Sequence, residues 1–151
     1  PPAGSDVIRL PEGVVISELE KADSSWPSSE YRTNELDFKG YVLDQFQRPT
    51  FKYSRGAVSI TDKSIPVASA SAEKPGTIRR MLKFSGGEPS SNLYLLLAQG
   101  KFQKDGTGYY NEEIFLSVKG GEVLVNDGDL RVPIVFKNGK SEVEIIYRWT
   151  D

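Results

Sequence analysis

Residues 109–112 carry the side chains that a sugar-binding site uses, and they follow a glycine-rich turn at residues 104–108. The flat rings of Tyr109 and Tyr110 can stack on the apolar face of a sugar, while Asn111 and Glu112 can bind its hydroxyl groups. Aromatic residues are, however, enriched in strands of any kind. The structural alternative is therefore that one tyrosine faces the core and the other caps a strand.

Trp26 and Tyr31 lie in a polar stretch, residues 22–34, which predicts a long ordered loop. An exposed tryptophan in such a loop would be a binding platform or an interface anchor. Because tryptophan side chains mostly end up largely buried, the alternative is a plug that covers an open end of the fold.

Asn126, Asp127 and Asp129 place several oxygen ligands close together, which is what Ca²⁺ requires. The segment lacks the twelve-residue spacing and the closing glutamate of an EF-hand loop. A plain turn is therefore the favoured interpretation, and we expect no metal site elsewhere in the chain.

Two adjacent pairs of like charge, Glu112-Glu113 and Arg79-Arg80, suggest a pair of catalytic acids and an anion clamp. Neighbouring residues on a strand point to opposite faces, so neither pair can act on one group. Arg79 or Arg80 alone could still face a partner.

The chain contains no cysteine and no histidine. This excludes disulfides, thiolate nucleophiles, Ser-His-Asp triads and the usual zinc sites. Met81 is the only methionine, and because histidine is absent the chain cannot supply a His/Met haem ligand pair. We therefore predict that this chain is not an enzyme on its own and holds no cofactor.

Charge is spread evenly along the chain, with 19 basic and 21 acidic residues in total and 9 and 11 in residues 1–75. This evenness argues against nucleic acid and anionic membranes as partners.

The longest apolar run, residues 93–98, is far shorter than the ~20 residues of a spanning helix, so we expect no membrane insertion. The opening, Pro1-Pro2-Ala3-Gly4, resembles a piece excised from a larger protein.

A strict two-residue period marks the end of the chain as a half-buried strand, with Val143, Ile145, Tyr147 and Trp149 on the inward face. The preceding run, residues 132–136, alternates in the same way. Pro133 within it indicates an edge strand or a bulge. Asn138-Gly139 between the two runs predicts a type I′ turn and hence a hairpin.

Further strands are predicted by alternation and flanking turns, and residues 93–98, apolar on both faces, should form a central strand. Many short strands separated by turns predict an all-β, mainly antiparallel β-sandwich, with a closed barrel as the alternative. We expect one domain over residues 1–151, with residues 66–76 as a surface loop. The remaining predicted strands are residues 14–19, 38–43, 50–54, 57–61, 77–84, 101–103, 109–110, 114–118 and 122–125.

Four aromatic residues recur at period two in neighbouring predicted strands: Phe38, Tyr41, Phe51 and Tyr53. We expect them to serve core and cross-strand packing. Gly40, between two of them, should mark a bulge or a close backbone approach.

The chain resembles a known module in its central and terminal motifs. The central one is Phe38-Lys39-Gly40-Tyr41-Val42-Leu43-Asp44 followed by Arg48-Pro49-Thr50-Phe51-Lys52-Tyr53, and residues 8–13, 26–27 and 132–149 also match. The module is a β-rich segment of large exported bacterial proteins that also carry c-type cytochrome domains and propellers resembling sugar dehydrogenases.

The resemblance implies an exported chain, periplasmic or extracellular, beside redox or carbohydrate-processing domains. The expected function is a non-catalytic accessory module that binds neighbouring domains, with carbohydrate as a second candidate partner. The ligand candidates are Trp26, Tyr31, Tyr109, Tyr110, Asn111 and Glu112. A purely structural docking module is the alternative, and a carboxylate-based glycosidase or lyase ranks last because it needs two acids facing each other across a cleft.

Overall fold

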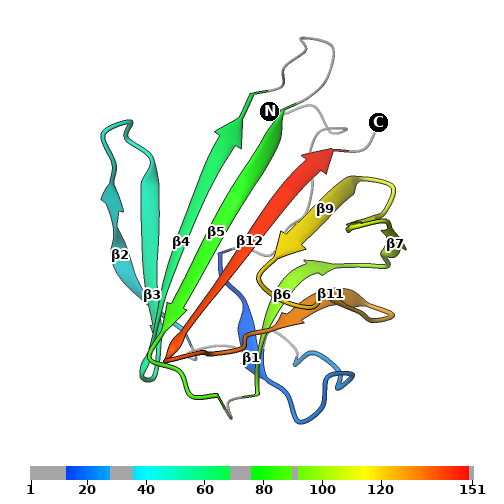
Figure 1. The fold of residues 1–151 in the computed structure, drawn as a ribbon, viewed down its shortest axis with the longest axis horizontal. Coiled ribbons are helices and arrows are strands. Elements are labelled where there is room, and N and C mark those ends of the chain that lie inside the picture. The colour runs from blue at the N-terminus through cyan, green and yellow to red at the C-terminus, as the bar shows by residue number, and fades with distance from the viewer. Residues whose placement is uncertain (1–12, 28–35, 69–75, 90–91, 150–151) are drawn as a thin grey trace.

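The computed structural model describes residues 13–27, 36–68, 76–89 and 92–149, which form two antiparallel sheets (Figure 1). The smaller sheet has four strands in the order β1-β6-β11-β10. These strands are β1 (Ile16–Glu18), β6 (Leu93–Gln99), β10 (Leu124–Val125) and β11 (Asp129–Pro133).

The larger sheet has eight strands in the order β2-β3-β4-β5-β12-β9-β8-β7. Neither sheet closes on itself, so the predicted all-β sandwich is confirmed and the barrel alternative is wrong. The described residues include no helix of the length and apolarity needed to cross a membrane. The strands are β2 (Asp37–Leu43), β3 (Pro49–Arg55), β4 (Val58–Val67), β5 (Thr77–Ser85), β7 (Gln103–Asp105), β8 (Gly108–Tyr110), β9 (Ile114–Lys119) and β12 (Lys140–Trp149).

The core lies between the two sheets and is built by side-chain alternation. On β12, Val143, Ile145 and Tyr147 are buried as predicted, but Trp149 at the strand end is only partly buried. β6 lies between β1 and β11 and is buried over most of its length, which confirms the prediction of a central strand. The large sheet contributes inward residues from β4, β5, β12, β9 and β8.

The predicted Asn138-Gly139 turn is present, with φ of 53° and 78° at the two residues. The predicted pairing of its flanking strands is wrong. Between Pro133 and Lys140 the chain crosses from the small sheet to the large one, and only Lys137 and Lys140 bridge. Both edges of β12 are already paired, with β5 on one side and β9 on the other.

Both predicted irregularities are present, but only the one at Gly40 lies at the residue that indicated it, since the shift in β11 precedes Pro133. β11, which ends at Pro133, has a register shift between Leu130 and Arg131, and β2 has one between Phe38 and Gly40. The predicted loop at residues 66–76 starts too early, because β4 continues through Pro66 to Val67. Residues 69–75 of that loop lie outside the described residues.

The larger sheet has twice as many strands as the smaller one, and β2 and β3 are its strands that remain uncovered. Both strands lie at one side of the large sheet (Figure 1), and neither contains a buried residue. Phe38, Tyr41 and Phe51 have the inward parity of the core residues on β4, yet they are 59%, 58% and 37% exposed. The expected core role is therefore wrong for these three, while the expected cross-strand packing is confirmed by the ring contacts of Phe38 and Tyr41 with Phe51. Tyr53 is half-buried against the core.

Because side chains alternate along β12, replacing each of two adjacent isoleucines by alanine should lower the free energy of unfolding by unequal amounts. Ile145 is 1% exposed in the core, whereas Ile146 lies half-buried on the outer face. We expect Ile145→Ala to lower the free energy of unfolding by about 2–5 kcal/mol, because it leaves a cavity. Ile146→Ala should cost about 1 kcal/mol. Urea denaturation of both variants measures the difference, and equal costs would contradict the inward and outward assignment.

Candidate functional site

A shallow pocket of about 510 Å³ lies beside the turn between β8 and β9. Tyr110 lies on its wall, and its hydroxyl donates a hydrogen bond of 3.0 Å to Gln103 Oε1. Glu112 and Glu113 are both exposed at the same pocket. The lining residues are Lys101, Gln103, Tyr110, Asn111, Glu112 and Glu113, so three of the predicted sugar-binding residues do meet there.

Tyr109 does not reach this pocket. Its ring is 8% exposed and belongs to the core. Tyr109 and Tyr110 therefore point to opposite faces, as the structural alternative required. Asn111 Oδ1 accepts hydrogen bonds from the backbone N–H groups of Glu113 and Ile114 at 2.8 and 2.9 Å. This side chain shapes the turn that starts β9, and a turn of this kind is common for asparagine.

Trp26 lies against a buried arginine rather than forming an open platform. The Arg131 guanidinium carbon is 5.4 Å from the centre of the Trp26 ring, and Arg131 is 2% exposed. Arg131 also donates to the backbone carbonyls of Ala22 and Ser24, so it holds this loop on the small sheet. This arrangement favours the interpretation of Trp26 as a plug that covers an open end of the fold over its interpretation as an exposed binding platform. Tyr31 lies outside the described residues.

The side chains of the calcium candidate, Asn126, Asp127 and Asp129, do not meet at a common point. Both carboxylate oxygens of Asp129 accept hydrogen bonds of 2.8 Å from Arg131. Asp127 is 98% exposed at its side chain and lies 3.8 Å from Lys101 Nζ. The backbone N–H of Asn126 donates to the Asp129 carbonyl at 2.9 Å, which closes a turn. Within the described ranges, no three acidic side chains gather around a common point.

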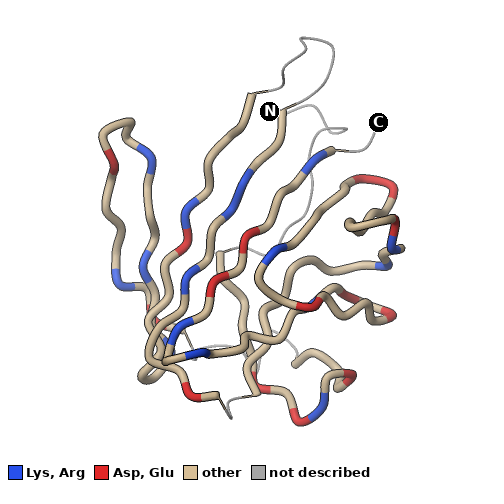
Figure 2. Tube along the Cα trace, viewed as in Figure 1, with Lys and Arg blue, Asp and Glu red and all other residues tan. Residues whose placement is uncertain are grey.

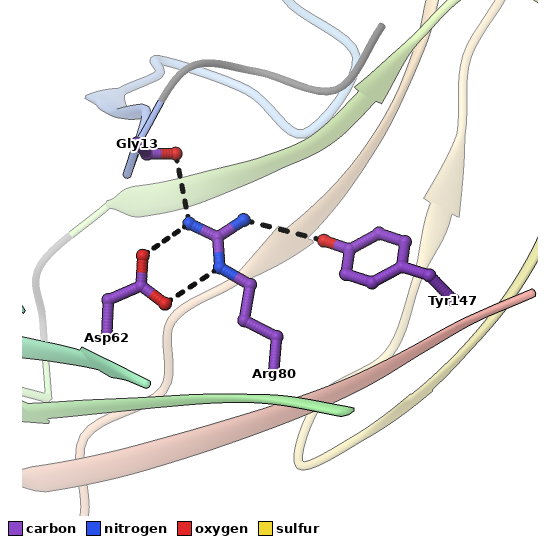
Figure 3. Close-up of polar contacts among 4 residues, drawn as sticks. All are labelled: Gly13, Asp62, Arg80 and Tyr147. Atoms are coloured by element: carbon purple, nitrogen blue, oxygen red, sulfur yellow. Dashed lines mark hydrogen bonds and ion pairs between the residues drawn. The ribbon is translucent and has the colours of Figure 1, made fainter. Parts of the chain in front are cut away.

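A second ion pair with largely buried side chains, Asp62 with Arg80, joins β4 to β5 (Figure 3). In the sheet register Asp62 lies opposite Phe51 of the exposed aromatic strands. Arg80 Nε and Nη2 donate to the two Asp62 oxygens at 2.8 and 2.7 Å. Nη2 also donates to the Gly13 carbonyl at 3.0 Å, and Nη1 lies 3.5 Å from the Tyr147 hydroxyl. One guanidinium therefore ties together β4, β5, β12 and the segment that enters β1.

Burial and charge shift the pKa values of this cluster. Burial lowers the pKa of Arg80, but its hydrogen bonds to Asp62 and the nearby Tyr147 raise it by more, so the net shift is upward. Burial raises the pKa of Tyr147, and the Arg80 charge offsets this only in part. Burial and then the Asp62 charge raise the pKa of Tyr53. Arg80 therefore stays charged beside two neutral phenols, which suits a structural clamp rather than a proton donor.

Sequence reasoning placed Arg79 and Arg80 on opposite faces, and this is confirmed: Arg79 pairs outward with Glu144, and Arg80 points inward. The partner of Arg80 was missed. Asp62 has the inward parity of Val58 and Ile60, and a charge at such a position signals a buried partner. That signal was present in the sequence, but the pairing of β4 with β5 was needed to identify Arg80 as the partner.

The exposed aromatic side chains form one surface on the β2–β3 hairpin, which we call the hairpin surface. Ring centres are 6.5 Å apart for Phe38 and Phe51 and 6.0 Å for Tyr41 and Phe51, within the range of aromatic contact. The hairpin surface comprises Phe38, Tyr41, Leu43 and Phe51, which share one face of the two strands, together with Phe46 in the adjoining turn.

The tip of this hairpin is held rigidly. Asp44 accepts backbone hydrogen bonds from Phe46 and Arg48 at 2.8 and 3.0 Å and a side-chain hydrogen bond from Lys63 at 2.9 Å. The Lys63 hydrogen bond, followed by the one from Arg48, lowers the pKa of Asp44 to about 2. The turn therefore presents Phe46, 65% exposed, in a fixed position with the Arg48 guanidinium 5.1 Å from its ring centre.

Comparison of the chain with protein-family models, curated proteins and solved structures finds no match. The functional argument therefore depends on the geometry of the chain itself.

The Asp62–Arg80 pair predicts strong coupling between its two partners. Asp62→Ala and Arg80→Ala should each lower the free energy of unfolding by about 3–5 kcal/mol, because each leaves a buried charge unpaired. The double variant should lose less than the sum of the two. The exposed outward pair Lys83 and Glu142, 3.9 Å apart, is the control and should show almost no coupling. Additive losses at Asp62 and Arg80 would contradict the clamp.

Proposed function

We propose that this chain is a non-catalytic accessory module that docks against another protein domain through its hairpin surface. The observation that carries the proposal is the exposure of Phe38, Tyr41, Leu43 and Phe46, each at least half accessible on one hairpin. Soluble domains rarely leave contiguous large apolar patches unpaired, and such patches mark interaction sites.

The chemistry of the hairpin surface fits a protein partner. Aromatic residues and arginine are enriched at the centres of protein interfaces, and Arg48 lies beside Phe46 here. The rigid tip, fixed by Asp44, limits the entropy lost when a partner binds. The setting implied by the resemblance, an exported protein with cytochrome and propeller domains, supplies partners of this kind.

The described side chains do not include a pair of carboxylates arranged for acid–base catalysis. The two buried carboxylates, Asp62 and Asp129, are each held by an arginine through two hydrogen bonds. Glu112 and Glu113 are adjacent and exposed rather than opposed across a cleft. A carboxylate-based glycosidase or lyase is therefore the least supported function.

The docking proposal predicts site-specific cross-linking in cells that naturally make this protein. A photoreactive phenylalanine at position 41 should capture a second domain, and the same probe at Lys104, on the far edge strand β7, should not. Adding Phe46→Ser to the position-41 probe should abolish the cross-link, because it removes the most exposed aromatic ring of the hairpin, while the melting temperature shifts by about 2 °C or less. Equal yields from positions 41 and 104 would contradict docking.

Carbohydrate binding is the second candidate, because the pocket at Tyr110 presents a phenol, an amide and two carboxylates together. Calorimetry against a panel of neutral oligosaccharides should then show binding that Tyr110→Ala weakens about tenfold or more. Trp26→Ala, which alters a ring outside this pocket, is the control and should keep the affinity. Absence of any binding, or equal losses in both variants, would exclude this pocket as a sugar site.

A further inference from the structure

The outer face of the large sheet, the face turned away from the core, concentrates basic side chains. Positions that alternate with the core residues on β3, β4, β5, β12 and β9 place seven basic and two acidic residues there. Figure 2 shows basic residues on β4, β5 and β12, with acidic residues between them on β4 and β12. The basic residues are Lys52, Lys63, Arg79, Lys83, Lys119, Lys140 and Arg148, and the acidic ones are Glu142 and Glu144.

Charge that is even along the chain is therefore uneven on the surface. The whole chain carries a net charge of −2, with 19 basic and 21 acidic residues. The excess of positive charge on one sheet face arises because strand alternation sorts side chains by parity. An evenly mixed sequence can build a basic face in this way.

Several of these cations are not neutralised by their neighbours. Arg79 pairs with Glu144, and Lys63 pairs with Asp44 at 2.9 Å. Lys83 lies 3.9 Å from Glu142, and both side chains are well exposed, so this pair is weak. Lys52, Lys119 and Lys140 form no ion pair with another residue in the described part of the chain.

A groove of about 350 Å³ crosses this face over β4, β5 and β12. It offers hydroxyl groups beside two ammonium groups, a combination that suits a ligand carrying both hydroxyls and negative charges. The residues on the outer face that line it are Ser59, Thr61, Lys83, Ser85, Lys140 and Glu142.

Two other anionic partners fit this face less well. Single-stranded nucleic acid is usually bound by stacking of its bases on aromatic rings, and Phe115, the aromatic on the outer face of these five strands, lies with its ring centre 4.4 Å from the Arg148 guanidinium. A flat anionic membrane would touch a twisted sheet only in part, since neighbouring strands rotate by about 20–25°. A linear polymer can follow the twist.

We propose that the outer face of the large sheet binds a linear anionic polysaccharide, with the groove between Ser59 and Lys140 as the centre of the contact. This surface is separate from the hairpin surface, so the proposal goes beyond domain docking. The anionic groups would meet Lys83 and Lys140, and the hydroxyls of the sugar chain would meet Ser59, Thr61 and Ser85.

The test uses calorimetry on the whole chain with dextran sulfate and polygalacturonate at 50 and 300 mM salt, and uncharged dextran as the neutral probe. We expect binding of an anionic polymer at 50 mM salt, marked weakening at 300 mM salt, and no binding of dextran. Lys83→Gln with Lys140→Gln should weaken binding about fivefold to tenfold.

Lys21→Gln with Lys104→Gln is the matched control, because it removes the same charge at exposed sites away from the groove. The control should keep the affinity, as should Phe46→Ser, which separates this proposal from docking by the hairpin surface. Equal weakening by both lysine pairs, absence of binding to both anionic polymers, or tighter binding of oligo-dT or of vesicles containing phosphatidylserine would overturn the proposal.

Discussion

The structure depends on an inequality between its two layers: a sheet of four strands covers a sheet of eight. Burial of apolar surface is the main force that holds sheets face to face, and it can act only where both faces are present. β4, β5, β12 and β9 lie within the covered region and supply the core, whereas β2 and β3 contain no buried residue. The hairpin surface is the uncovered continuation of the same apolar face, and the docking proposal follows from that continuity.

Two arginines with largely buried side chains, Arg80 and Arg131, lie at the margins of the covered region. Arg80 holds Asp62 and reaches the Gly13 carbonyl, while Arg131 holds Asp129 and reaches the carbonyls of Ala22 and Ser24. In each case a bidentate carboxylate satisfies the charge, and a spare N–H anchors a segment that no sheet ladder holds. A guanidinium suits this task because its donors diverge in a plane. These ion pairs fix where segments lie more than they add to stability, since desolvation cancels much of their attraction.

Much of the fold could be predicted from the sequence, because its signals are local. Alternation located most of the strands, and Asn138-Gly139 and Gly40 marked a turn and a bulge correctly. Sheet membership could not be predicted, because a tight turn looks the same whether its flanking strands pair or cross between layers. The same limit explains the error over Phe38, Tyr41 and Phe51: their parity was correct, but parity does not say whether a second layer lies opposite.

The candidate sites were predictable to the same extent: groupings of residues adjacent in the chain could be predicted, and contacts between strands could not. Sequence reasoning brought Tyr110, Asn111 and Glu112 to one pocket correctly, since they are adjacent in the chain. It could not choose which tyrosine faces the core, and it missed Asp62 with Arg80 because that contact joins residues 18 positions apart on paired strands. The basic outer face was hidden for a related reason. Its lysines and arginines come from five strands, and acidic residues of the opposite parity or of the loops balance them in the sequence.

Hydroxyl-radical footprinting of the isolated chain tests the central claim most directly, because it reports the solvent access of individual rings. The account predicts rapid oxidation of Phe38, Tyr41 and Phe46, at rates about tenfold above those of Phe84 and Tyr147, which are 2% exposed. Protection of the three hairpin rings to the level of Phe84 would show that the apolar face is covered within the chain itself, and this result would contradict an open docking surface.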